Sequence, residues 1–130
     1  MTNATTEAPA AKKPLELKDI AQLGYLQKTK EIFNGVTVTV QTLPISRQQK
    51  ILAVIPAEIT DPLLRFIRLQ VETLANATLA VNDEKYTEAN LDYLREFYGG
   101  LQSRVLQAFY EVYQSMMDEQ EQILGGLKKT

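Results

Sequence analysis

The 130 residues suit a single domain, and an apolar content of 45% excludes an intrinsically disordered chain. The net charge of -2 comes from acids and bases that alternate along the chain, so no concentrated basic patch supports a dominant nucleic-acid role. The absence of cysteine and histidine excludes disulfides, most nucleophile–base pairs and most zinc sites. The sequence contains no apolar run of about 18 residues, so no membrane span is predicted.

The chain begins with a segment that has no apolar periodicity. Residues 1–14 are rich in Thr, Ala, Pro and Lys, and we expect a disordered tail that lacks the apolar core of a secretory signal. A short helical pattern follows over Leu15–Leu23, and Gly24 is typical of a helix end.

A β-hairpin is predicted at about residues 25–43. Two extended runs, Tyr25–Phe33 and Val36–Leu43, flank Asn34-Gly35, a dipeptide favoured in two-residue loops because both positions need positive φ. Such a loop pairs Phe33 with Val36. It also pairs Glu31 with Val38 and Thr29 with Val40. The face formed by Val36, Val38 and Val40 is a candidate strand-edge or oligomer contact, since unpaired edges accept strands.

Two helices are predicted next, each with its own start signal. Ser46 and Gln49 form a capping-box pattern for a helix that runs to about Ile55, where Pro56 stops it. We expect this helix to bury Ile51, Leu52, Val54 and Ile55. Asp61-Pro62 then opens a long amphipathic helix that ends near residues 79–81.

The remaining chain predicts a polar loop and two further helices. After the loop at residues 82–86, Thr87 caps a helix over Glu88–Tyr98 that breaks at Gly99-Gly100. A final helix runs to about Leu124, and Gly125-Gly126 ends it before a flexible tail at residues 125–130. The expected fold is therefore mainly α (α+β), a compact domain over residues 15–124 with four to five helices and an N-terminal β-hairpin.

One row of acids invites a chemical interpretation. Glu84, Glu88, Asp92 and Glu96 recur every four residues and would line one face of a helix. A metal or acid–base site is one interpretation, and a solvated face is the one we favour. No phosphate loop, dinucleotide fingerprint or nucleophile elbow is present, so we expect neither an enzyme nor a cofactor.

Aromatic residues crowd the last third of the chain and suggest a protein-binding surface. Buried aromatic anchors are enriched in the centres of interfaces. Core packing competes with this interpretation, most strongly for Phe97 and Phe109. The partner-binding candidates are Phe66, Val71, Leu74, Tyr93, Phe97, Tyr110, Tyr113 and Met117.

The order of these signals resembles that of the tail assembly chaperones of long-tailed bacteriophages. The likeness covers about residues 15–124. It rests on Ile20-Ala-Gln-Leu-Gly-Tyr25 leading into the hairpin, on Thr42-Leu-Pro-Ile-Ser-Arg-Gln-Gln49, on residues 69–79, and on residues 91–124, which include Leu106-Gln-Ala-Phe-Tyr-Glu-Val-Tyr113.

The resemblance implies a non-catalytic protein of the host cytoplasm. It would bind the tape measure protein, coat the apolar helices of that client, and help recruit tail tube subunits. Self-association into a homo-oligomer is a further possibility. Two alternatives remain open at this stage: a structural tail or baseplate subunit retained in the virion, and a small regulatory or nucleic-acid-binding protein.

Overall fold

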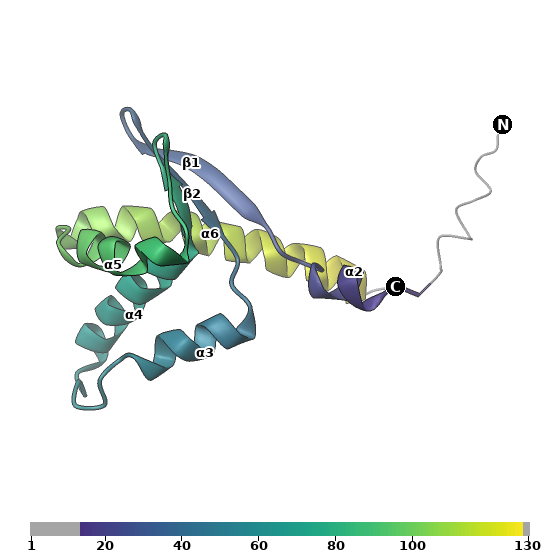
Figure 1. Cartoon of the computed structure of the whole chain (residues 1–130), viewed down its shortest axis with the longest axis horizontal. Coiled ribbons are helices and arrows are strands. Elements are labelled where there is room, and N and C mark those ends of the chain that lie inside the picture. Colours follow the sequence, from purple (N-terminus) through teal and green to yellow (C-terminus); the bar gives the residue numbers. More distant parts are fainter. Residues whose placement is uncertain (1–13, 129–130) are drawn as a thin grey trace.

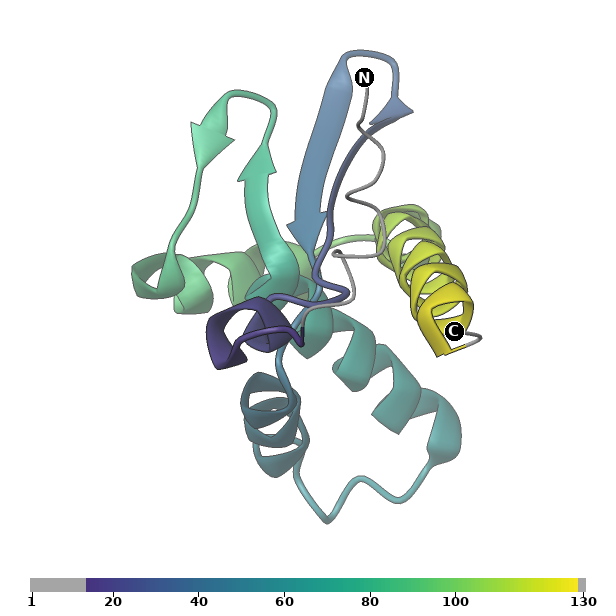
Figure 2. The same ribbon diagram turned by 90° about the vertical axis from the view of Figure 1, so that its right-hand side faces the viewer.

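The computed structural model describes residues 14–128 and places a four-stranded antiparallel sheet across a set of helices (Figure 1). The strand order is β1-β2-β3-β4, and the two hairpins stand side by side above α3 and α4, with α6 along one side (Figure 2). The prediction of an α+β fold with an N-terminal hairpin is confirmed. The elements are α2 (Leu17–Ala21), β1 (Gln27–Phe33), β2 (Val36–Gln41), α3 (Ile45–Ala53), α4 (Pro62–Ala77), β3 (Thr78–Val81), β4 (Glu84–Lys85), η2 (Glu88–Asn90), α5 (Leu91–Gly99) and α6 (Ser103–Lys128).

The predicted hairpin is present, but its register differs. Phe33 pairs with Val36 as expected, whereas Lys30, not Glu31, pairs with Val38, and Lys28 pairs with Val40. The shift arises from an irregularity between Glu31 and Phe33 that gives β1 one extra residue, which is a β-bulge. Gly35 has a φ of +79°, while Asn34 does not lie in the left-handed region, so the predicted turn geometry was wrong at Asn34.

The start of α3 also corrects a prediction. Pro44 occupies the N-cap position with extended backbone and no side-chain cap, so Ser46 lies inside the first turn and forms no capping box. Gln48 instead donates from Nε2 to the carbonyl oxygen of Leu43 at 3.0 Å. Ile51 and Ile55 are buried as predicted. Leu52 and Val54 are exposed, because successive helical residues point about 100° apart and cannot all face α4.

The start of α4 follows the predicted signal. The Asp61 carboxylate accepts from the backbone amides of Leu63 and Leu64, at 2.9 and 3.2 Å, and Pro62 takes the first helical position. Both features satisfy the free amides of a helix N-terminus.

Removing this cap is expected to weaken the fold moderately. Asp61→Ala should lower the free energy of unfolding by about 1 kcal/mol, since alanine cannot accept from the free amides. Urea denaturation followed by circular dichroism measures the effect. Asp61→Asn, which keeps an acceptor oxygen, is the matched control, and an equal loss in both variants would contradict the capping role.

The end of α4 differs from the prediction because a strand replaces its last turn. The helix stops at Ala77, and Thr78–Val81 forms β3, which pairs with β2 and turns back through Asn82 (φ 54°) into β4. The segment predicted as a polar loop therefore contains a second hairpin. Pairing with β2 supplies backbone hydrogen bonds that helical periodicity alone does not reveal.

The last helix also runs further than predicted. It continues through Gly125 and Gly126 to Lys128, so this pair does not end it. Once a helix is nucleated, each further residue adds a hydrogen bond, and glycine is then tolerated. The predicted flexible tail at 125–130 is thus helical as far as residue 128. Residues 129–130, and residues 1–13 of the predicted N-terminal tail, lie outside the described part of the chain.

The core lies between the sheet and helices α4, α5 and α6. Its fully buried members include Val40, Leu74, Leu94, Tyr98 and Met116. Edge-to-face contacts fix the aromatic part: Phe109 lies 5.9 Å from Phe97 and 5.3 Å from Tyr98 between ring centroids. The Tyr98 hydroxyl is 2.6 Å from Thr78 Oγ1, so this buried phenol has a hydrogen-bond partner.

A buried ion pair joins α4 to α5. Glu72 has no solvent exposure, and its Oε2 accepts from Arg95 Nε at 2.7 Å, with Arg68 Nε at 3.6 Å. Its other oxygen, Oε1, is buried and has no hydrogen-bond partner among the described residues. Arg95 also donates to Asp92 at 2.7 Å, which orients the guanidinium toward Glu72.

The first helix stands apart from the core. No residue of α2 is buried, and the helix projects beyond the sheet (Figure 1). The segment that follows α2 contacts α6. There, Gln120 Nε2 donates to the Gly24 carbonyl oxygen at 2.9 Å. Gly24 has a φ of +81°, which favours glycine, and an added Cβ would lie 3.0 Å from a Leu124 methyl group, so the Leu124 side chain would have to shift.

Candidate partner-binding groove

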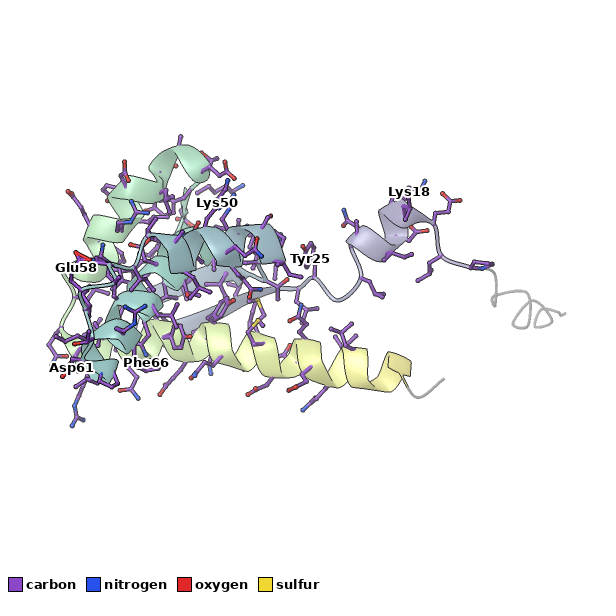
Figure 3. All side chains as sticks on the ribbon, turned by 90° about the horizontal axis from the view of Figure 1, so that it is seen from below. Lys18, Tyr25, Lys50, Glu58, Asp61 and Phe66 are labelled. Carbon is purple, nitrogen blue, oxygen red and sulfur yellow. The ribbon has the colours of Figure 1, made fainter. Side chains whose placement is uncertain are left out.

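A groove without charged lining runs between α3 and α6, with α4 at its base (Figure 3). Its volume is about 240 Å³. The two flanking helices both pack on α4, which leaves the space between them open. The groove is lined by Leu43, Gln48, Ile51, Leu52, Leu69, Thr73, Tyr110 and Tyr113.

The position of α3 sets one wall of the groove. Ile51 anchors the helix on its buried side, and Ile55, just beyond the end of the helix, is also buried. Arg47 holds the other side, donating to Asn76 Oδ1 at 3.1 Å and forming an ion pair with Glu88. Leu52 consequently turns outward along the wall and remains 59% exposed.

A row of aromatic rings forms the opposite wall. Tyr110 lies 6.2 Å from Phe66 in an edge-to-face arrangement and 5.8 Å from Tyr113, measured between ring centroids. Burial raises the pKa of Tyr110 and of Tyr113, so both hydroxyls stay neutral at physiological pH. Tyr113 is buried, so Phe66 and Tyr110 supply the accessible ring surface of this wall.

Fixed charge is kept on the far side of α3. Lys50 points away from α6 (Figure 3) and lines a separate hollow together with Arg47, Glu72 and Arg95. No charged residue appears among those lining the groove, within residues 14–128. An apolar helix could enter without desolvating a fixed charge, which is the main penalty for burying polar surfaces.

The structure gathers part of the predicted partner-binding set in this groove. Tyr110 and Tyr113 line it, Phe66 extends the aromatic row, and Met117 follows one turn later on α6 against the core. Val71 and Leu74 do not reach the surface. They are buried on the inward side of α4, so their assignment as partner contacts does not fit this structure.

The other two aromatic candidates lie elsewhere. Tyr93 and Phe97 line a hollow beside the β3–β4 turn, together with Tyr86. Phe97 is partly buried against the core, and Tyr93 is exposed. The predicted set is thus divided between two surfaces.

The proposed strand-edge residues are not at an edge. Val36, Val38 and Val40 belong to β2, which has neighbours on both sides in the sheet. Val38 and Val40 are buried in the core. The edge strands are β1 and β4, so the prediction of an edge contact through these valines was wrong.

The sequence interpretation overlooked the α3 wall. Leu52 was expected to be buried, although four apolar residues within Ile51–Ile55 exceed what one helical face holds. That excess was the available signal that one of them faces outward. Leu69 and Thr73 also line the groove, and nothing in the sequence around them predicts this. Their place in the groove depends on how α3 and α6 pack in the folded protein.

The row of acids does not gather into a metal site. Glu84 lies on β4 and Glu88 in η2, not on the helix that holds Asp92 and Glu96, and all four acids are exposed. Glu88 pairs with Arg47 and Asp92 with Arg95. Within residues 14–128 no group of three or more His, Cys, Asp or Glu is placed to hold a metal ion. In the same range no helix is long and apolar enough to cross a membrane.

Comparisons with protein-family models, with curated proteins and with solved structures find no match to this chain. The geometry of the groove and the sequence pattern are therefore the grounds on which a function is argued.

Proposed function

We propose that this protein is a non-catalytic assembly chaperone that holds an apolar helical segment of a client in the α3–α6 groove. The observation that carries the proposal is the groove itself, which is open, lined without charge, and bordered by exposed Leu52 and Phe66. Soluble proteins recognise amphipathic helices through such grooves, with anchors spaced three to four residues apart.

The dimensions favour anchoring side chains over a deeply buried ligand. A hollow of about 240 Å³ takes in apolar side chains while the helix that carries them rests on the two walls. Full burial of each large apolar side chain contributes about 1.5–3 kcal/mol, so a few anchors suffice for stable binding. The exposed apolar rim supports a role for this surface, since large exposed apolar patches mark interaction sites.

The sequence resemblance supplies the client in this proposal. Tape measure proteins of phage tails present long apolar helices, which match the chemistry of the groove. The chaperone would act in the host cytoplasm, keep the tape measure protein soluble, and help recruit tail tube subunits.

A binding assay with charge substitutions tests the groove. Leu52→Asp or Tyr110→Asp should weaken binding to a co-expressed tape measure protein at least ten-fold, because a carboxylate would be buried against an apolar helix. Affinity purification and titration measure the loss, and circular dichroism verifies the fold. Leu17→Asp, an equally drastic change on exposed α2, is the matched control and should bind normally.

Purified particles provide the second test. A chaperone is released during assembly, so mature virions should lack this protein when examined by mass spectrometry. Its presence at a fixed ratio would identify a structural tail subunit instead.

Normal client binding by Leu52→Asp and Tyr110→Asp would refute the groove as the binding surface.

A further inference from the structure

A second hollow lies between the β3–β4 turn and α5. Its volume is about 370 Å³, and it is separate from the α3–α6 groove. The β3–β4 hairpin and the residue after it contribute Val81, Asn82, Asp83, Glu84 and Tyr86, and α5 contributes Tyr93 and Phe97. Asn82 makes the turn possible with its φ of 54° and accepts from the Thr37 amide at 3.0 Å, which ties the turn to β2.

Aromatic rings form one wall of this hollow. The Tyr86 and Tyr93 ring centroids are 6.0 Å apart, and their planes are inclined by 35°. Phe97 is fixed from behind by edge-to-face contact with Phe109. Tyr93 is 56% exposed, so ring surface remains open to an incoming group.

The charge on the strand side is negative. Asp83 and Glu84 line the hollow, and no lysine or arginine of residues 14–128 does so. Lys85 lies between Glu84 and Tyr86 on the strand and so points to the opposite face. The Tyr86 hydroxyl donates to Glu84 Oε1 at 3.1 Å and holds that carboxylate beside the rings.

The Tyr86 hydroxyl is suited to this positioning role. Burial, followed by the hydrogen bond and charge of Glu84, raises the pKa of Tyr86 to about 12. It therefore stays protonated at physiological pH and keeps donating to the carboxylate. The hollow is therefore lined by both π-surface and negative charge.

We propose that this hollow binds the cationic head of an arginine or lysine side chain on a partner protein. Aromatic faces attract cations, and carboxylates pair with them, so the two halves of the lining select the same chemistry. At an exposed site the cation–π contribution is only about 0.5–1 kcal/mol, so the carboxylates supply part of the attraction and a basic side chain alone binds weakly. The basic group is therefore part of a larger protein that adds surface around it. This site is distinct from the groove and goes beyond the chaperone function proposed above.

A peptide titration tests the assignment. The probe is a capped glycine peptide with two arginines, titrated into the full ¹⁵N-labelled chain, with a citrulline peptide as its uncharged match. We expect the arginine peptide, and a lysine counterpart, to shift the amide signals of residues 82–86 and 93–97. The citrulline peptide should leave them unchanged. Asp83→Asn and Tyr93→Leu should each raise the dissociation constant of the arginine peptide at least five-fold.

Matched variants keep the outcome interpretable. Asp118→Asn removes an exposed acid of α6, and Tyr25→Leu removes an exposed tyrosine outside the hollow; both should bind the peptide normally. Equal binding of the citrulline peptide, signal changes confined to other residues, or unchanged binding by Asp83→Asn and Tyr93→Leu would overturn the proposal. Leu52→Asp should retain peptide binding. The experiment therefore distinguishes failure of this proposal from failure of the proposed client binding in the α3–α6 groove.

Discussion

Replacing Arg95 with leucine is expected to lower the free energy of unfolding by about 3–5 kcal/mol, because it leaves the buried Glu72 carboxylate without its closest cation. Arg95 Nε is 2.7 Å from Glu72 Oε2, whereas Arg68, at 3.6 Å, is more exposed and makes a weaker contact. The second carboxylate oxygen already lacks a hydrogen-bond partner among the described residues. Urea denaturation of the variant, followed by circular dichroism, measures the change.

A double substitution separates the buried charge from lost packing. Glu72→Leu combined with Arg95→Leu should recover most of the stability, since replacing both members of a buried pair with apolar residues is often neutral or stabilising. Arg68→Leu is the matched control and should have the smaller effect. If the double variant were no more stable than Arg95→Leu, desolvation of Glu72 would not explain the loss.

Leu74→Ala is expected to lower the free energy of unfolding by about 2–5 kcal/mol. Leu74 is fully buried in α4, the helix that packs against α3, α5 and α6 and also contacts β2. Truncation removes buried methyl groups and leaves a cavity that neighbouring elements fill only in part. Leu64→Ala, on the exposed side of the same helix, should change stability by no more than about 0.5 kcal/mol. Equal losses of unfolding free energy at both positions, measured by thermal or urea unfolding, would contradict the assignment of Leu74 to the buried side of α4 and Leu64 to its exposed side.

Some features set by local chemistry were predictable from the sequence, although the predicted capping box at Ser46 and the predicted helix end at Gly125-Gly126 are absent. The Asp61 cap and the Thr87 cap depend on side chains a few residues from the backbone groups that they satisfy. The Asn34-Gly35 turn joins two neighbouring strands, and α5 ends at Gly99 as expected. These elements and their order were therefore correctly identified.

Features set by distant pairing were not predictable in this way. β3 forms because Thr78–Val81 lies against β2, about 40 residues earlier in the chain. The bulge in β1 shifts the register by one residue relative to the pairing that a regular two-residue hairpin predicts.

The same distinction applies to the groove. Tyr110 and Tyr113 share a helical face, which favoured their joint exposure to a partner, but Tyr113 is buried and only Tyr110 is partly exposed. The opposing wall depends on how the chain between Ala53 and Pro62 turns α3 back over α4, with Arg65 donating to the carbonyl oxygens of Pro56 and Ile59 at 3.0 and 2.9 Å. Residue spacing does not encode that placement, and Leu52 was therefore assigned to the core.

We expect the contact of Gly24 with α6 to couple the local unfolding of α2 to that of the end of α6. The hydrogen bond from Gln120 to Gly24 joins residues 96 positions apart, and no residue of α2 is buried to hold that helix independently. Two glycines, each less favourable in a helix than alanine by about 1 kcal/mol, follow Leu124 in the last turns of α6. If those turns fray, we expect the Leu124 side chain to leave Gly24 and α2 to be released with it, while the sheet and α4 stay folded.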